Sequence, residues 1–240
     1  MQHRAVRQRR LASGHPVAQS SPATRVPIGG AIKINSNASM LPDDTKPRLH
    51  ALSNASWSPL ALGSSGALGL ATIAILFAMG RSAWCRCGTL RLSSWDIWSS
   101  HNSQHLLDPY FFSHLLHGIL FCGFLYWLPR IVAPGWKFVL AVACECSWEI
   151  LENSPLIIDR YRTATIALNY YGDSVANSIC DLLACMLGYG IGLLLGLRKS
   201  VALVVTIELL MVVTIRDCLT LNIVMLVYPL EAIKQWQVGG

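Results

Sequence analysis

Residues 59–80 have the sequence PLALGSSGALGLATIAILFAMG, and the whole stretch 49–80 contains no Asp, Glu, Lys or Arg. A helix that crosses a membrane needs about 20 consecutive apolar residues. This stretch therefore predicts a first membrane-spanning segment, retained as a signal anchor rather than cleaved. The composition agrees, because 53% of the 240 residues are hydrophobic and only 13% are charged, which excludes an ordinary soluble globular protein.

Five further apolar segments follow, and Pro or Gly marks several of their ends, as is typical of helix boundaries. They are expected at 110–128, 136–153, 174–197, 201–215 and 218–230. The last two are shorter than about 20 residues, so a re-entrant or interfacial pair is an alternative to two crossings. The expected fold class is all-α, a polytopic transmembrane helical bundle of about six segments within residues 59–237. A soluble helical bundle is the alternative.

Residues 1–58 are expected to form a disordered basic tail, since they show no apolar periodicity. The first 39 residues hold six Lys and Arg and no acidic residue, whereas the rest of the chain has 13 basic and 13 acidic residues. The net charge of +6 therefore belongs to the tail and is no argument for a nucleic-acid partner. Membrane lipids are the expected partners, protein partners stay open, and Met40 is an alternative start of the native chain.

The distribution of Lys and Arg predicts the orientation. With the N-terminus inside, thirteen of these residues lie inside and six outside, although six of the thirteen belong to the tail. The positive-inside rule then places both termini in the cytoplasm.

Three segments carry polar residues at helical spacing on one face. These are Tyr110, His114 and His117 in the second segment, Glu145, Glu149 and Glu152 in the third, and Asp173, Asn177 and Asp181 at the start of the fourth. Because successive crossings alternate in direction, all three faces are expected in the same half of the membrane. The connecting loop with Asp159-Arg160-Tyr161-Arg162 reaches that side and offers cationic partners for the carboxylates.

Ionisable groups in such positions usually mark a functional interior. The candidate catalytic residues are His114, His117, Glu149, Glu152, Asp173 and Asp181, and the candidate ligands of a divalent metal are His117, Glu149 and Asp181. Imidazole with carboxylate suits zinc, manganese or iron, and a metal-bound water can attack a lipid-linked ester or phosphate. Proton-coupled transport or sensing, and hydrogen bonds that only fix helix packing, are the alternatives. Whether the chain is an enzyme stays open.

A second group of metal-ligand residues precedes the second segment. Cys85-x-Cys87 is followed after thirteen residues by His101-x-x-x-His105, which resembles the spacing of a structural zinc site. The one-residue gap between the cysteines is shorter than the usual two to four. Cys85, Cys87 and His105 are therefore weaker metal candidates, with a disulfide or free thiols as the alternatives.

The fourth segment contains Gly188-x-Gly190-x-Gly192 and Gly192-x-x-x-Gly196. Small residues at such spacing predict a close approach of two helices.

Several motifs occur in order along residues 70–237: CRCG at 85–88, NSQH at 102–105, SHLLHG at 113–118, WEILENSP at 148–155, DRYRT at 159–163 and YYGDSVANS at 170–178. Together they resemble an uncharacterised family of bacterial multi-pass inner-membrane proteins that carries a domain-of-unknown-function label. The resemblance implies a location in the inner membrane and no established activity. The His, the Glu and the Gly-Asp-x-x-x-Asn pattern also resemble VanZ-like membrane proteins more distantly, and this likeness carries little weight on function.

Overall fold

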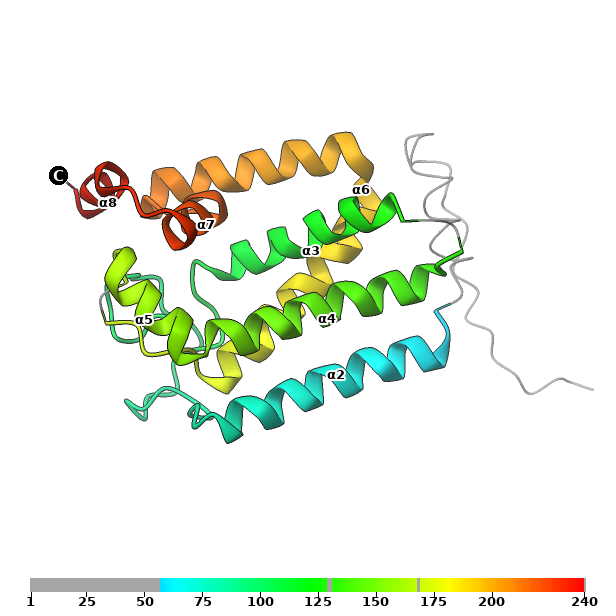
Figure 1. The fold of residues 1–240 in the computed structure, drawn as a ribbon, viewed down its shortest axis with the longest axis horizontal. Coiled ribbons are helices and arrows are strands. Elements are labelled where there is room, and N and C mark those ends of the chain that lie inside the picture. Colours follow the sequence, from blue (N-terminus) through cyan, green and yellow to red (C-terminus); the bar gives the residue numbers. More distant parts are fainter. Residues whose placement is uncertain (1–56, 129–130, 168, 240) are drawn as a thin grey trace, which may run out of the picture. The chain divides into compact units, whose positions relative to one another are not determined.

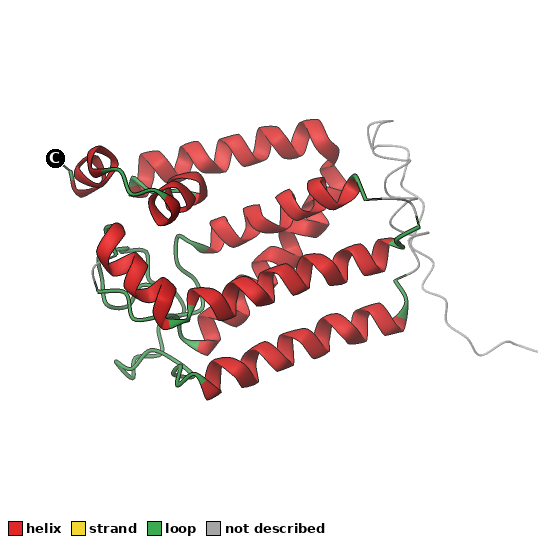
Figure 2. Ribbon diagram, in the orientation of Figure 1, coloured by secondary structure: helices red, strands yellow, loops and turns green. Residues whose placement is uncertain are grey.

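The computed structural model describes residues 57–128, 131–167 and 169–239, so nearly all of the expected basic tail lies outside the described residues. The regular secondary structure of the described part is all helical (Figure 2), which confirms the predicted all-α class. The helices are α2 (Pro59–Ala78), α3 (Phe111–Tyr126), α4 (Pro134–Glu152), α5 (Pro155–Ala164), α6 (Val175–Ile215), α7 (Leu219–Val227) and α8 (Glu231–Val238).

Local sequence explains where several helices begin. Ser58 caps α2, because its hydroxyl accepts a hydrogen bond from the backbone N–H of Ala61, and Pro59 occupies the first turn. Proline is favoured there because a helix does not use the N–H groups of its first turn. Pro134 begins α4 in the same way, and Ser174 caps α6 through a hydrogen bond from the N–H of Asn177.

The segment after α4 differs from the expected connecting loop. Pro155 follows the capping residue Ser154 and begins a further helix, α5, which contains Asp159 and Arg162. A proline that ends one helix can also occupy the first turn of the next one. The expectation of an irregular connection was therefore wrong for residues 155–164.

Helix α6 contains the expected fourth and fifth segments. Gly196 interrupts it with φ 68° and ψ 174°, a conformation that glycine adopts without steric strain. The chain reverses direction there (Figure 1), so the two halves run as a helical hairpin.

Two helices, α2 and α6, are long and apolar enough to cross a membrane by length and composition. Helix α3 is apolar but shorter. The expected sixth segment contains α7, whose nine residues extend only about 14 Å at 1.5 Å per residue. The prediction of six crossings is therefore not established, and a full crossing by α7 is excluded by its length.

Glycines bring α3 and α6 together. A Cβ atom on Gly118 would lie 2.6 Å from the backbone nitrogen of Tyr189, and one on Gly192 would lie 2.9 Å from Cβ of Cys122. A Cβ on Gly188 would overlap the carbonyl oxygen of Leu115. The predicted close approach is confirmed at Gly188 and Gly192, whereas the site of a Cβ on Gly190 is open.

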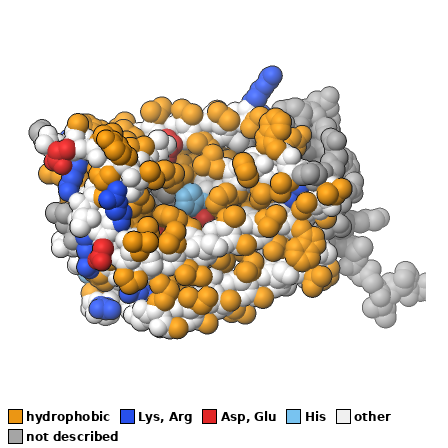
Figure 3. Space-filling model, viewed as in Figure 1, with side chains coloured by type: hydrophobic (Ala, Val, Ile, Leu, Met, Phe, Trp, Pro, Cys, Tyr) orange, Lys and Arg blue, Asp and Glu red, His pale blue; other side chains and the backbone are white. Residues whose placement is uncertain are grey.

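The start of α3, the end of α4 and the start of α6 lie at the same end of the helical unit, beside α5 and the long loops (Figures 1 and 2). The surface of the helices is rich in exposed apolar side chains (Figure 3). The polar residues of the three helices therefore meet inside an otherwise apolar body.

Candidate functional site

Glu145 connects two histidines of α3. His114 Nδ1 lies 2.6 Å from Glu145 Oε1, and His117 Nδ1 lies 3.0 Å from Glu145 Oε2. Because a carboxylate only accepts hydrogen bonds, both rings donate from Nδ1. Each ring is then left with Nε2 as the nitrogen that can bind a cation or exchange a proton. Glu145 is completely buried, so this pairing fixes the orientation of both rings.

Three further carboxylates surround His114. Glu149 Oε1 lies 3.4 Å from His114 Nδ1, outside hydrogen-bond geometry. Both oxygens of Glu149, one oxygen of Glu152 and one oxygen of Asp181 are buried without a hydrogen-bond partner. An unpaired buried carboxylate costs several kcal/mol, so such groups normally hold a proton or face a cation or ligand. The site therefore contains several buried carboxylate oxygens that accept no hydrogen bond from the described residues.

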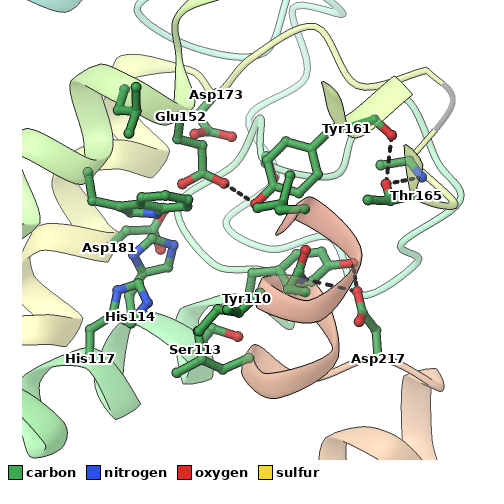
Figure 4. A pocket seen from close by; sticks show the side chains of 18 of the residues that line it. Tyr110, Ser113, His114, His117, Glu152, Tyr161, Thr165, Asp173, Asp181 and Asp217 are labelled. Atoms are coloured by element: carbon green, nitrogen blue, oxygen red, sulfur yellow. Dashed lines mark hydrogen bonds between the residues drawn. The ribbon is translucent and has the colours of Figure 1, made fainter. Parts of the chain in front are cut away.

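A second layer of polar groups lies toward the loop end. Tyr161 donates from its hydroxyl to Glu152 at 3.0 Å, and Tyr170 donates to Asp173 at 3.0 Å (Figure 4 shows the first bond). Asn153 donates to the other oxygen of Asp173 at 3.0 Å. Burial, followed by repulsion from Asp108, raises the pKa of Asp173 to about 6. Burial also raises the pKa of Tyr161 and Tyr170, so both phenols stay protonated donors.

These groups line a cavity of about 520 Å³. Its polar wall contains His114, His117, Glu152, Tyr161, Tyr170, Asp173 and Asp181 (Figure 4). Its apolar wall contains Leu120, Phe121, Leu151, Ile166, Ile223 and Leu226, from α3, α4, α7 and the loop after α5. Figure 3 shows a histidine and acidic atoms within an apolar face, so the cavity opens through the apolar flank of the helices.

The structure brings the six candidate catalytic residues into one region. Five line the cavity, and Glu149 lies behind them against His114. Two groups have ligand atoms within 4.8 Å of one another: His114 with His117 and Glu145, and His114 with Glu149 and Glu152. Asp181, one of the three expected metal ligands, belongs to neither group, although it contributes to the electrostatic environment of His114.

Some site residues were absent from the candidates. Glu145 shares the helical face of Glu149 and Glu152, and this spacing was the available signal. No comparable spacing pointed to Tyr161 or Tyr170, because the fold of the segment after α4 brings them to the cavity. Asn153, the C-cap of α4, was also not a candidate, and it contacts the site through Asp173.

The arginines expected to pair with the carboxylates have other partners. Among the described residues, Arg160 Nε donates to the carbonyl oxygen of Leu226 at 2.8 Å, and Arg162 Nε donates to the carbonyl oxygen of Tyr170. The expectation that arginines of this segment pair with the carboxylates was therefore wrong for Arg160 and Arg162.

The second group of metal-ligand residues also comes together. Cys85, Cys87, His101 and His105 each offer a ligand atom within 4.8 Å of all the others. A hydrogen bond with Cys85, followed by one with Thr89, lowers the pKa of the exposed Cys87 to about 6, whereas burial raises that of Cys85. The loop thus presents a thiol that ionises readily beside two imidazoles.

Comparison with known families identifies the family of this chain. The family described as Protein of unknown function (DUF2585) matches residues 76–239, which is more than half of the chain. The chain belongs to this family. The match confirms the predicted resemblance to an uncharacterised family, and residues 76–239 of this chain include those of the cavity and of the Cys/His loop.

Individual relatives cover most of their own length. A UPF0314 protein of Sphingopyxis alaskensis is 48% identical over 167 residues, which is 70% of this chain and 89% of the relative. A UPF0314 protein of Paracoccus denitrificans is 44% identical over 162 residues, 68% of this chain and 84% of the relative. One of Novosphingobium aromaticivorans is 46% identical over 178 residues, 72% of this chain and 90% of the relative. No solved structure matches the chain.

Proposed function

We propose that this chain is a polytopic helical protein of the bacterial inner membrane whose cavity binds and chemically converts the polar end of a lipid-linked substrate. Its N-terminus would lie in the cytoplasm, and five crossings would place the C-terminal α7 and α8 on the opposite side rather than in the cytoplasm. The observation that carries the proposal is the combination of unpaired buried carboxylates with an opening through an apolar surface. A water-soluble substrate needs no such opening, whereas a lipid can place its chains against the flank and its polar end inside.

The apolar surface supports a membrane location. Large hydrophobic side chains are exposed along both halves of α6, including Leu183, Leu187, Leu194, Val205, Leu209 and Val213. A contiguous exposed apolar surface of this extent marks a membrane or protein interface rather than a face in contact with water. Helices α2, α3, α4 and the two halves of α6 are the proposed membrane segments, and α7 with α8 lies at the boundary of the membrane.

The chemistry proposed is acid–base or metal-assisted attack on an ester or phosphate. His114, Glu149 and Glu152 would hold a divalent cation, which would polarise the substrate oxygen and lower the pKa of a bound water. Glu145 would position the two imidazoles, and His117 at the cavity wall would exchange a proton with the substrate. Tyr161 and Tyr170 would donate hydrogen bonds to its polar end.

A role in helix packing alone explains less of this geometry than the proposed chemistry does. Helix-joining polar residues satisfy one another, as Glu145 and His114 do. Among the described residues, both oxygens of Glu149 and one oxygen each of Glu152 and Asp181 have no hydrogen-bond partner. The cluster therefore provides more acceptors than helix packing requires.

The experiment is lipid analysis of a deletion strain complemented with variants. The wild-type chain and Glu231→Gln, an exposed change on α8, are expected to restore the lipid profile. Strains that carry His117→Ala or Glu149→Gln instead are expected to accumulate a modified lipid, as the deletion strain does. A stable, normally inserted His117→Ala protein that restores the profile contradicts the proposal. An unchanged lipid profile with altered uptake or efflux of a solute supports proton-coupled transport instead.

A further inference from the structure

We propose that Cys85, Cys87, His101 and His105 form a tetrahedral zinc site that holds the loop between α2 and α3 against the polar end of the cavity. This site is separate from the His/Glu cluster and uses none of its residues. All four ligand atoms lie within 4.8 Å of one another. Two thiolates with two imidazoles are a frequent ligand set of structural zinc.

The distances are close to those of a bound ion. With Zn–S near 2.3 Å and Zn–N near 2.0 Å, tetrahedral geometry separates a sulfur and a nitrogen ligand by about 3.5 Å. Cys85 Sγ lies 3.4 Å from His101 Nδ1. The rings of His101 and His105 are stacked, with centroids 5.5 Å apart and planes inclined by 29°. Only small side-chain movements are needed to close the four ligands on one ion.

His105 provides an independent indication of a ligand. The residue is completely buried, and neither of its ring nitrogens has a hydrogen-bond partner of normal geometry among the described residues. Burying an imidazole without such a partner is unfavourable. A metal ion bound to one nitrogen removes this cost at that atom and explains why His105 faces the two cysteines and His101.

The backbone around the cysteines is arranged to stabilise thiolates. The N–H of Cys87 donates to Cys85 Sγ at 3.4 Å, and the N–H of Thr89 donates to Cys87 Sγ at 3.4 Å. Gly88, at φ 72°, permits the tight turn that brings these groups to the sulfurs. Hydrogen bonds to coordinating atoms are a regular part of metal sites.

The same loop forms part of the cavity wall and the base of α6. Asn102 and Ser103 line the cavity. Gln104 donates to the carbonyl oxygen of Gly172 at 2.7 Å, and the N–H of Ser174 donates to the carbonyl oxygen of Ser103 at 3.0 Å. His101 and His105 lie on either side of residues 102–104. A zinc ion bound to both histidines would therefore hold the contacts of Ser103 and Gln104 with Ser174 and Gly172 in place. The site stabilises the cavity and takes no part in its chemistry.

The test begins with the wild-type chain, purified without chelator in the presence of thiol reductant. Metal analysis is expected to find one equivalent of zinc bound by thiolate. Replacement of zinc by cobalt(II) is expected to produce a thiolate-to-cobalt charge-transfer absorption. The His/Glu cluster cannot produce this absorption because it contains no cysteine. Absence of thiolate-bound metal after addition of zinc to the reduced protein overturns the proposal.

Variants locate the ion. Cys85→Ser/Cys87→Ser is expected to lose the zinc equivalent and the absorption, whereas Cys180→Ser, a change on α6 away from the loop, retains both. His105→Gln, a milder change, is expected to lower zinc affinity at least tenfold while the protein still elutes as a folded species. In the proposed orientation the loop faces the periplasm, so mass mapping of protein from native membranes is included. A Cys85–Cys87 disulfide found there overturns the proposal.

Discussion

Glu145 Oε1 lies 2.6 Å from Nδ1 of His114, although 31 residues separate the two in the chain. The contact joins α3 to α4 behind the cavity wall, which His114 lines, and both residues are buried. The second oxygen of Glu145 binds His117, so one carboxylate orients both imidazoles. We therefore expect the stability of the bundle and the proposed reactivity of the cavity to depend on the same side chain.

Replacing Glu145 tests this dependence. Glu145→Ala leaves the buried imidazole of His114 and the half-buried imidazole of His117 without their acceptor, and loss of one partner of a buried ion pair costs about 3–5 kcal/mol. A markedly lower midpoint of thermal unfolding in detergent is expected. Glu145→Gln retains an acceptor oxygen and is expected to unfold at an intermediate temperature. Equal midpoints for wild type and Glu145→Ala would show that the contact contributes nothing to stability.

The contact between α3 and α6 is tested at two neighbouring glycines. Gly188→Ala places a methyl group on the backbone of Leu115, which cannot move aside without separating the helices, so a loss of about 1–3 kcal/mol is expected. Gly190→Ala meets open space and serves as the control. Thermal unfolding and yield in detergent are the measurements. If both variants behave alike, the close approach at Gly188 is not needed for packing.

Asp217 predicts a pH dependence of stability. Burial raises its pKa to about 6, although Tyr110 and Gln237 donate hydrogen bonds to it at 2.9 and 3.1 Å. The folded chain therefore binds this proton more tightly than the unfolded chain. The resulting stability is fully present below the unfolded pKa of about 4 and is lost as the pH rises through about 6, an effect on the order of 3 kcal/mol.

The measurement compares wild type with Asp217→Asn between pH 4 and 8. Both proteins contain the other buried carboxyl groups, so the difference between their unfolding midpoints isolates Asp217. As the pH rises, the unfolding midpoint of the wild-type chain is expected to fall by several degrees more than that of the variant. Parallel curves would contradict the prediction.

The proposed opening for a lipid is tested at the cavity wall formed by α7. Leu226→Trp fills space beside the cavity and is expected to reduce complementation of the deletion strain at least tenfold. Val227→Trp changes the next residue, which is exposed and does not line the cavity, and is expected to complement normally. Normal complementation by a correctly inserted Leu226→Trp protein argues against access of substrate past α7.

Much of the helical organisation follows from local patterns. Pro59 and Pro134 begin helices because their fixed φ suits the first turn, and Gly196 breaks α6 near the expected boundary between the fourth segment (174–197) and the fifth (201–215). Helical spacing also identified the faces that carry His114 and Glu149. These features depend on residues within a few positions of one another, which is why the sequence alone predicts them.

Other features depend on contacts between distant segments. The spacing of Glu145, Glu149 and Glu152 does not reveal which one binds the histidines, because this depends on how α4 packs against α3. The turn of Pro155 into α5, which brings Tyr161 to Glu152, was likewise not predicted.

Residue types and their periodicity thus determined that the chain is helical and carries one polar face on each of three helices. Only the tertiary structure decided that Glu145 joins the two histidines and that other acidic oxygens remain unpaired beside an apolar opening. The physical reason is range: helix formation and capping act over one or two turns, whereas the environment of a buried charge depends on every segment packed around it.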